Sequence, residues 1–477
     1  MPDSNSVSGS SGRNVVLWFR RDLRLDANPA LQEAASLARD RAGHVVALFV
    51  LDPTLIARSG ANRLAFLYES LRSLRASGIP LVVRSGDPSR VVAGVAQEAE
   101  ADTVVCAADF SPLGRERDAR VATVLRIDGV RLHAKGSPYL VEPGTTRKDD
   151  GTPFKVFTPF RRVWERHAEH AMANRAMGNA PMGGVAWCQN LWSDEIPAAP
   201  QGASTRLPVA SEEAAHDRLA TFCERNLASY DRLRNDPAAD ATSRLSADLK
   251  FGLLHPAQIL PHLAGGGAGP DVFRSELAWR EFYADVLWHR PETTRQAFIP
   301  KMEAIEVDTG PRAEERFRAW CHGDTGYPFI DAGMRQLLHE GWMHNRVRMA
   351  TASFLVKDLH IDWRRGAAWF MEQLVDGDVA SNQHGWQWTA GTGTDAAPYF
   401  RIFNPIAQGR RFDPTGMYIR RHIPELSPLD DRTIHEPWTV PEGGLFGGIS
   451  GYPGPIVDHA EERRTAMARY AVLKRTP

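Results

Sequence analysis

Short runs of consecutive apolar residues recur through the first third of the chain, and they restrict the fold more than any other feature. Uninterrupted apolar runs are typical of strands buried on both faces, as in parallel sheets. Helical patterns lie between them, at Asn62–Arg75 and Pro88–Glu100. Strands alternating with helices predict a doubly wound parallel sheet, an α/β domain of Rossmann-like type. The predicted strands are Val15–Phe19, Val45–Leu51, Leu81–Val83, Thr103–Ala107 and Val130–His133.

The strand signal then disappears. Residues 143–211 are rich in Pro, Gly and Ala, which predicts an extended interdomain linker with a short helix at Phe157–Ala171. From residue 212 only helical patterns remain. We expect a disordered tail (1–13), an α/β domain (14–142), the linker (143–211) and an all-α domain (212–477). The helices predicted in the last are Ala214–Asn226, Pro270–Trp288, Ala313–His322, Ile330–Glu340, Asn345–Leu359 and Gly366–Leu374.

Charge and cysteine content exclude several classes of protein. The net charge is −1, so global charge predicts no polyanionic partner, although acids and bases can separate onto different faces. The four Cys are scattered without a CxxC pair, which argues against a zinc or iron–sulfur site and favours a reduced, cytoplasmic compartment. The sequence has no GxGxxG after the first strand, no P-loop motif, no apolar run of membrane-spanning length and no signal peptide.

Unusual chemistry is concentrated between Asp376 and Pro405, which reads DGDVASNQHGWQWTAGTGTDAAPYFRIFNP. Gly391 and Gly393 permit close approach of the backbone to a ligand. The two Trp of the WQW motif offer flat stacking faces. The alternative is a capped turn between two helices with Trp residues in the core.

Three further patterns carry polar side chains suited to a flat or phosphorylated ligand. Glu276, Trp279, Arg280 and Tyr283 share one helix face, which is either a ligand wall or an amphipathic surface. The segment WMHNRVRM can supply an amide and arginines for a nucleic acid, or it is a solvated helix with a core Met. The TSRLS segment is either an anion site or a plain helix cap.

Together these motifs resemble the DNA photolyase/cryptochrome family, most closely its class I cyclobutane pyrimidine dimer photolyases. The resemblance runs from VVLWFRRDLRLDANPAL, at Val15, through Gln408, and its most specific parts are TSRLS, SELAWREFY, GWMHNRVRM and the Asp376–Pro405 stretch. It implies an antenna domain, a linker and a helical domain that binds FAD. The implied FAD contacts are Tyr230, Thr242, Ser243, Arg244, Leu245, Ser246, Trp342, Asn345, Asp376, Gly377, Asp378 and Asn382.

The resemblance also implies a light-driven reaction on DNA. Excited, reduced FAD gives an electron to a cyclobutane dimer, the ring opens and the electron returns. Asn382 would face the flavin nitrogen that gains a proton on reduction, and Glu276 would hydrogen-bond the dimer; both count as catalytic. The implied DNA contacts are Arg234, Glu276, Trp279, Arg280, Tyr283, Asn345, Arg346, Met349, Trp388 and Gln408. A base flipped into such a pocket needs stacking faces and cations for the backbone.

Three departures from the family pattern concern electron supply, the antenna and the flavin surroundings. Trp386 and Trp363 match the proximal and middle members of an electron-transfer chain, but the outer member falls in EAIEVDTGPRAEE, so Trp320 is a candidate replacement. Leu113-Gly114 stands where one branch has the Asn-Glu that holds a folate, which favours a deazaflavin-type antenna over methenyltetrahydrofolate. Gln383-His384 replaces Asn-Gly, and we interpret His384 as a surface residue.

The resemblance leaves rival functions open. A cryptochrome photoreceptor would signal through partners, but plant cryptochromes carry an acid at the position of Asn382. Repair of (6-4) photoproducts uses paired histidines where this chain has Asn345 and Met349. A flavin-storage protein is a third alternative. The sequence therefore favours a monomeric, metal-free enzyme that acts on DNA containing cyclobutane pyrimidine dimers.

Overall fold

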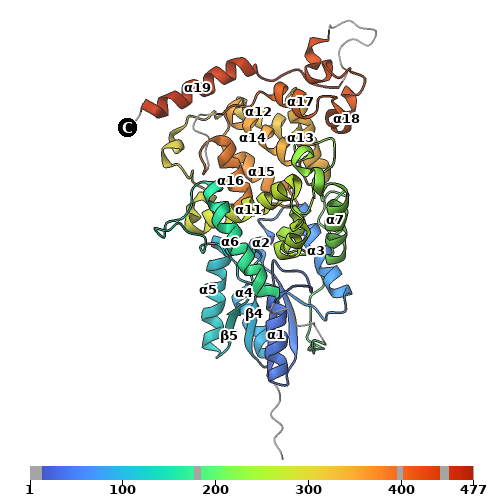
Figure 1. Ribbon diagram of the computed structural model, residues 1–477, viewed down its shortest axis with the longest axis vertical. Coiled ribbons are helices and arrows are strands. Elements are labelled where there is room, and N and C mark those ends of the chain that lie inside the picture. The colour runs from blue at the N-terminus through green and yellow to red at the C-terminus, as the bar shows by residue number, and fades with distance from the viewer. Residues whose placement is uncertain (1–12, 177–183, 395–400, 441–450, 476–477) are drawn as a thin grey trace, which may run out of the picture.

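The computed structural model describes residues 13–176, 184–394, 401–440 and 451–475. The chain folds into an α/β domain and a helical domain (Figure 1). Most of the predicted tail therefore lies outside the described residues. The predicted doubly wound sheet is confirmed, with strand order β3-β2-β1-β4-β5 and parallel pairing throughout. The strands are β1 (Asn14–Phe19), β2 (Val45–Leu51), β3 (Val82–Ser85), β4 (Ala101–Cys106) and β5 (Arg131–Ala134).

Alternate residues of the central strand β1 face two different cores. Val15, Leu17 and Phe19 pack with α1 (Pro29–Asp40) and α3 (Ala61–Ala76). Val16 and Trp18 pack with α4 (Pro88–Glu98) and α5 (Pro112–Ile127) on the other face. Because both faces are covered, the strand is apolar throughout, as the sequence predicted. A short helix α2 (Pro53–Ile56) follows β2.

The second half of the described chain is helical, which confirms the predicted fold class. The longest element, α11 (Ala268–His289), crosses the middle of the domain (Figure 1). The other α-helices are α7 (Glu212–Arg225), α8 (Tyr230–Leu233), α9 (Ser246–Phe251), α10 (Pro256–Ile259), α12 (Pro311–His322), α13 (Pro328–Glu340), α14 (Asn345–Lys357), α15 (Trp363–Gln373), α16 (Val379–Ala390), α17 (Pro405–Phe412), α18 (Met417–His422) and α19 (His459–Arg475). Short 3₁₀ helices include η3 (Pro291–Thr294) and η4 (Pro300–Ala304).

The predicted linker packs on both domains. Its helix α6 (Phe157–Ala176) lies against α11, and Trp164 donates its indole N–H to buried Glu281 at 2.7 Å. Glu281 also accepts from the backbone N–H groups of Leu140 (2.6 Å) and Val141 (3.0 Å). One buried carboxylate thus joins three segments, and its desolvation is offset by three hydrogen bonds.

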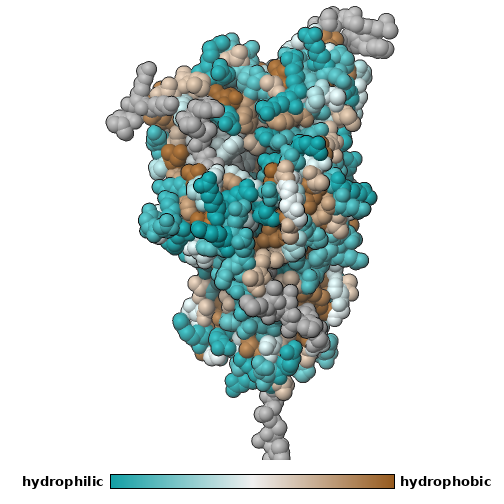
Figure 2. Space-filling model, in the orientation of Figure 1, coloured by the Kyte–Doolittle hydropathy of each residue, from teal (hydrophilic) through white to brown (hydrophobic). Residues whose placement is uncertain are grey.

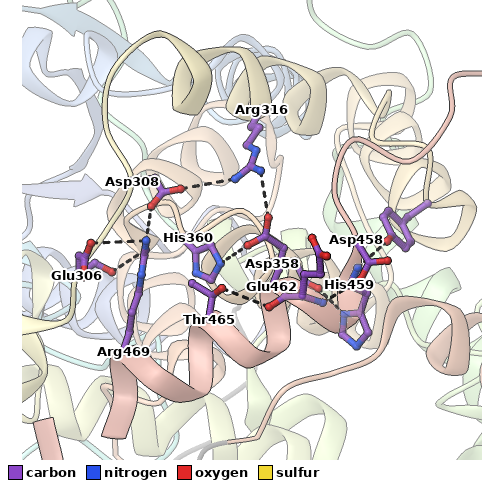
Figure 3. Close-up of polar contacts among 12 residues, drawn as sticks. Glu306, Asp308, Arg316, Asp358, His360, Asp458, His459, Glu462, Thr465 and Arg469 are labelled. Atoms are coloured by element: carbon purple, nitrogen blue, oxygen red, sulfur yellow. Dashed lines mark hydrogen bonds and ion pairs between the residues drawn. The ribbon is translucent and has the colours of Figure 1, made fainter. Parts of the chain in front are cut away.

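The C-terminal helix α19 is attached by charged groups along one side (Figure 3). Glu462 accepts from Arg316 at 3.1 Å and contacts His360 at 2.8 Å. Arg469 donates to Asp308 at 2.7 Å, and His459 contacts Asp358. Burial lowers the pKa of His360, although Glu462 opposes that shift. These contacts hold α19 to the turn that follows α14 and to the segment before α12.

The surface seen in Figure 2 is largely hydrophilic, with hydrophobic residues in small separate areas. Within the described residues, no helix is both long enough and apolar enough to span a membrane. The same part of the chain contains no group of three or more His, Cys, Asp or Glu arranged to hold a metal ion.

We expect Glu462→Ala to loosen α19 selectively, because it removes the carboxylate that accepts from Arg316 and contacts His360. Losing hydrogen bonds to charged groups costs roughly 2 kcal/mol. Limited proteolysis should then cut within residues 459–475 faster than in the unchanged protein. The matched control is Glu461→Ala, the exposed neighbour on the same helix. Equal cleavage of both variants would show that the ion pairs do not hold α19.

Candidate functional site

The Asp376–Pro405 stretch is built around the helix α16 and not around a turn, although Trp386 lies in the core as the rival expectation predicted. Asp378 caps the helix by accepting from Ser381 N–H at 3.2 Å. Gly391, at φ 82°, ends the helix in the left-handed conformation that glycine tolerates. Gly393 packs against the backbone of Gln387, where a Cβ would lie 2.9 Å from it. Both glycines therefore serve the end of α16, which corrects the expectation of a ligand approach. Residues 395–400 lie outside the described residues.

The two acids at the start of this stretch have different partners. Asp376 is buried, and its Oδ2 accepts from Arg348 at 2.8 Å, while its buried Oδ1 has no partner among the described residues. Asp378 accepts from Arg21 at 2.8 Å and lies 3.7 Å from Lys250 Nζ. Despite burial, Arg21 and Lys250 lower the pKa of Asp378. The Asp378 side chain thus joins the two domains through Arg21 and Lys250. Gly377 beside it is crowded by the Arg63 guanidinium.

The other expected cofactor contacts lie on α8, the turn before α9, and the start of α14. Tyr230 is buried, and burial raises the pKa of its hydroxyl. Thr242 Oγ1 is buried and has no hydrogen-bond partner among the described residues. Arg244 lies over the Trp342 ring at 4.1 Å, which brings the TSRLS segment next to α14. Ser243 Oγ accepts from Leu245 N–H at 3.4 Å, and α9 begins at Ser246.

These residues fit FAD by an observation independent of the sequence motifs. Buried polar atoms normally have hydrogen-bond partners, and an unpaired one costs about 1–3 kcal/mol. Thr242 Oγ1 and Asp376 Oδ1 are such atoms, one a hydroxyl and the other a carboxylate oxygen. A ligand that carries phosphate, hydroxyl and imide groups, as FAD does, offers complementary partners to both.

The predicted face of α11 is half-buried and carries an ion pair. Glu276 pairs with Arg234, and each side chain keeps 29% of its surface exposed. One face of Trp279 is covered by Phe157, with ring centroids 3.7 Å apart and an interplanar angle of 9°. Tyr283 stacks at 5.6 Å on His384. The structure therefore leaves a carboxylate, a guanidinium and an indole edge partly accessible on one surface.

Arg280 does not join this group. Its guanidinium donates to the carbonyl oxygens of Pro138 and Leu249, both at 3.1 Å, and lies 4.6 Å from the Tyr139 ring. It therefore faces the α/β domain, which corrects the expectation that it contacts DNA. Helical spacing places it on the α11 face, but a long side chain can leave the face from which it starts.

Cations gather beside the Glu276–Arg234 pair. Arg346 donates to Asn235 Oδ1 at 2.6 Å and lies over the Phe412 ring at 4.6 Å. Burial lowers its pKa, and the positive charges of Arg234, Arg411 and Arg401 lower it further. Met349 is 3.7 Å from the Arg346 guanidinium, and the nearby expected contacts Asn345, Trp388 and Gln408 are exposed or half-buried. A cluster of like charges is stabilised by an anionic ligand.

The aromatic residues around Trp386 form a buried group. Trp386 lies 5.0 Å from Phe370 and 6.0 Å from Trp320, and Trp363 belongs to the same core. Trp320 is fully buried and donates its N–H to Thr351 O at 3.0 Å. It therefore neighbours the proximal Trp directly and lies inside the protein.

His384 is buried, so its interpretation as a surface residue is wrong. Its ring contacts Ala380 O at 2.8 Å and Thr293 Oγ1 at 3.0 Å, and burial lowers its pKa to about 4. Sequence reasoning also missed Arg21 and Lys250. The signal available for Arg21 was its place directly after β1, because residues at the carboxyl end of a central parallel strand commonly line a site.

Comparisons with known proteins agree with this site. Residues 15–177 match the family described as DNA photolyase, and residues 273–472 match the FAD-binding domain of DNA photolyase. A deoxyribodipyrimidine photo-lyase from Agrobacterium fabrum is 39% identical over 97% of this chain and 98% of its own.

Two solved structures share the whole fold. A bacterial class III photolyase from Agrobacterium tumefaciens has a TM-score of 0.88 and 36% identity, covering 99% of this chain and all of its own. A Synechocystis cryptochrome has a TM-score of 0.82 and 28% identity, covering 96% of this chain and 99% of its own. With the family matches and a relative 39% identical along almost its whole length, the chain belongs to the DNA photolyase family.

Proposed function

We propose that this enzyme uses light to split cyclobutane pyrimidine dimers in DNA. The observation that carries the proposal is the half-exposed Glu276–Arg234 pair beside Trp279 on α11, next to the arginine cluster around Arg346. Within one region this surface offers an indole ring for stacking, a carboxylate for hydrogen bonding and cations. Those are the groups that a flipped-out dimer and its phosphates require.

FAD supplies the light-driven electron, and the chain supplies binding and orientation. Asp376 and Thr242 carry unpaired buried oxygens for it. Tyr230, Trp342 and Asn345 complete the proposed site. The reaction is redox-neutral overall: the dimer gains one electron, two carbon–carbon bonds break, and the electron returns. No bound metal is part of this proposal.

DNA binding releases Glu276 from its partner in the proposed mechanism. Arg234 and Arg346 turn toward backbone phosphates, and Gln408 contacts the same strand. Glu276 then hydrogen-bonds the dimer, which stacks between Trp279 and Trp388 and is lined by Asn345 and Met349. We further propose that the enzyme acts as a cytoplasmic monomer, which the four unpaired cysteines favour.

Two features favour repair of cyclobutane dimers over the rival functions. Asn382 carries an amide, whereas the plant cryptochromes carry an acid at this position. Asn345 and Met349 stand where (6-4) enzymes have histidines. We propose that the antenna is of deazaflavin type rather than methenyltetrahydrofolate, because Leu113-Gly114 stands in place of the Asn-Glu pair that holds a folate in one branch of the family.

The proposed function is tested with an oligonucleotide that contains one thymine dimer. We expect thymine absorbance to recover under blue light and to stay unchanged in darkness, because the electron donor must be excited. Recovery in both conditions would contradict a photochemical mechanism, and recovery in neither would contradict dimer repair. The absorption spectrum of the same sample reports whether an antenna chromophore is bound.

Glu276→Gln should lower the yield of repair per absorbed photon while DNA binding survives. We propose that the protonated carboxyl of Glu276 stabilises the electron-rich dimer, and an amide N–H is a weaker acid and donor than a carboxyl O–H. Losing roughly 1 kcal/mol of stabilisation changes a rate about five-fold. Single-turnover repair and binding of the same oligonucleotide separate the two effects. Asp271→Asn, on an exposed acid of the same helix, is the matched control. An unchanged yield would remove Glu276 from the chemistry.

Trp320→Phe should slow the photoreduction of oxidised flavin. We propose that Trp320 passes an electron to Trp386 and that an external thiol finally replaces that electron. Transient absorption should show less of the long-lived tryptophan radical, whereas the control Trp369→Phe, a half-buried Trp on α15, should resemble the unchanged protein. Unchanged radical formation in Trp320→Phe would exclude this route.

A further inference from the structure

Two neighbouring side-chain amides on α16, those of Asn382 and Gln383, are hydrogen-bonded in series. Gln383 donates its Nε2–H to Thr294 O at 2.6 Å. A carbonyl oxygen only accepts, so the Gln383 atom facing Thr294 must be the amide nitrogen. Gln383 Oε1 therefore points the other way, and it accepts from Asn382 Nδ2 at 3.0 Å.

Matching donors with acceptors in the same way determines the orientation of the Asn382 amide. Its Nδ2 also donates to Ala367 O on α15 at 3.0 Å. An amide nitrogen carries two hydrogens, and both are now used. Asn382 Oδ1 is the remaining polar atom, and no residue within the described ranges donates to it. Two backbone carbonyls, Ala367 O directly and Thr294 O through Gln383, thus determine which end of the Asn382 amide points outward.

The anchor on Thr294 is itself firmly held. Gln387, one turn along α16, donates to Thr293 O at 2.8 Å and accepts from Phe298 N–H at 2.8 Å. His384 contacts Thr293 Oγ1 at 3.0 Å and stacks on Tyr283. Three side chains of α16 therefore attach it to η3 and the segment that follows. The position of the Thr294 carbonyl is consequently a property of the fold.

We propose that Gln383 is a positioning residue that makes Asn382 an acceptor-only partner of the flavin. This rests on the proposed place of Asn382 beside the flavin nitrogen that is protonated on reduction. The reduced ring offers an N–H there, which Oδ1 can accept. The oxidised ring offers a lone pair, which would face a second lone pair and lose a hydrogen bond. The arrangement therefore favours the reduced cofactor, the state that repair requires.

Gln383→Met tests the proposal through the reduction potential of bound FAD, measured in darkness without DNA. Methionine has a similar length but no amide, so Asn382 Nδ2 keeps only one of its two acceptors, Ala367 O. The amide can then turn more readily and donate to the oxidised ring. We expect the ratio of reduced to oxidised flavin at a fixed potential to fall about ten-fold, which is about 30 mV for a two-electron couple. An unchanged potential would overturn the proposal.

Thr389→Val is the structural control, because it removes a hydrogen bond within the same helix, from Thr389 Oγ1 to Gly385 O at 3.1 Å, without touching Asn382 or Thr294. It should lower the melting temperature and leave the potential unchanged. Gln383→Glu gives a rescue: when protonated, its carboxyl can donate to Thr294 O and accept from Asn382. Its potential should match that of the unchanged protein at acidic pH and deviate at alkaline pH. An equal shift in Thr389→Val, or no pH dependence in Gln383→Glu, would overturn the proposal.

A further variant separates this proposal from the assignment on which it rests. Asn382→Leu removes the amide itself and should shift the potential at least as far as Gln383→Met does. If Asn382→Leu shifts the potential and Gln383→Met does not, only the role of Gln383 is wrong. If neither variant shifts it, Asn382 does not face the flavin nitrogen, and the proposed site must be revised.

Discussion

The buried ion pair between Asp378 and Arg21 is the contact on which the site depends. It joins Arg21, the second residue after β1, to the N-cap of α16, and Lys250 adds a third charge. Because its partners lower the pKa of Asp378, the contact is present above the usual Asp pKa of 3.8 and is lost only in strong acid. A capped, charge-anchored α16 then presents Asn382 and Trp386, which lie one turn apart on the same face, to α15. Trp388 lies at a different angle around the helix and therefore faces another side.

Local separation of charge reconciles a DNA-binding function with a net charge of −1. Many arginines are neutralised in pairs, as Arg316 is by Glu462 and Arg335 by Glu425. Around Arg346 the balance differs, because the positive charges of Arg234, Arg401 and Arg411 act on its guanidinium together with the negative charge of Glu276. A phosphate bound there relieves like-charge repulsion as well as forming its own ion pairs. Composition alone cannot reveal this, because it counts charges without placing them.

Sequence patterns predicted elements well and long-range partners poorly. Each of the five strands and α11 were found within a few residues, because burial on both faces and helical spacing are local properties. The partners of Asp378 and Asp376 were not found, since Arg21 lies 357 residues from Asp378 in the chain. Arg280 was assigned to the wrong side because spacing fixes the Cα direction and not the end of a long side chain. His384 was assigned to the surface although its stacking partner, Tyr283, lies on another helix.

Two departures from the family pattern are Gln383 on α16 and the missing outer Trp before α12. In the proposals made for them, both affect the fraction of flavin that is reduced in darkness. The sequence has no Trp between Trp288 and Trp320, and in the proposed route electrons come through Trp320, a buried neighbour of Trp386 whose N–H donates to Thr351 O. Burial disfavours positive charge on that ring, so this supply is slow to complete. An Asn382 amide held as an acceptor stabilises the reduced state once it is reached. A protein whose flavin is reduced slowly therefore benefits most from a site that keeps the flavin reduced in darkness.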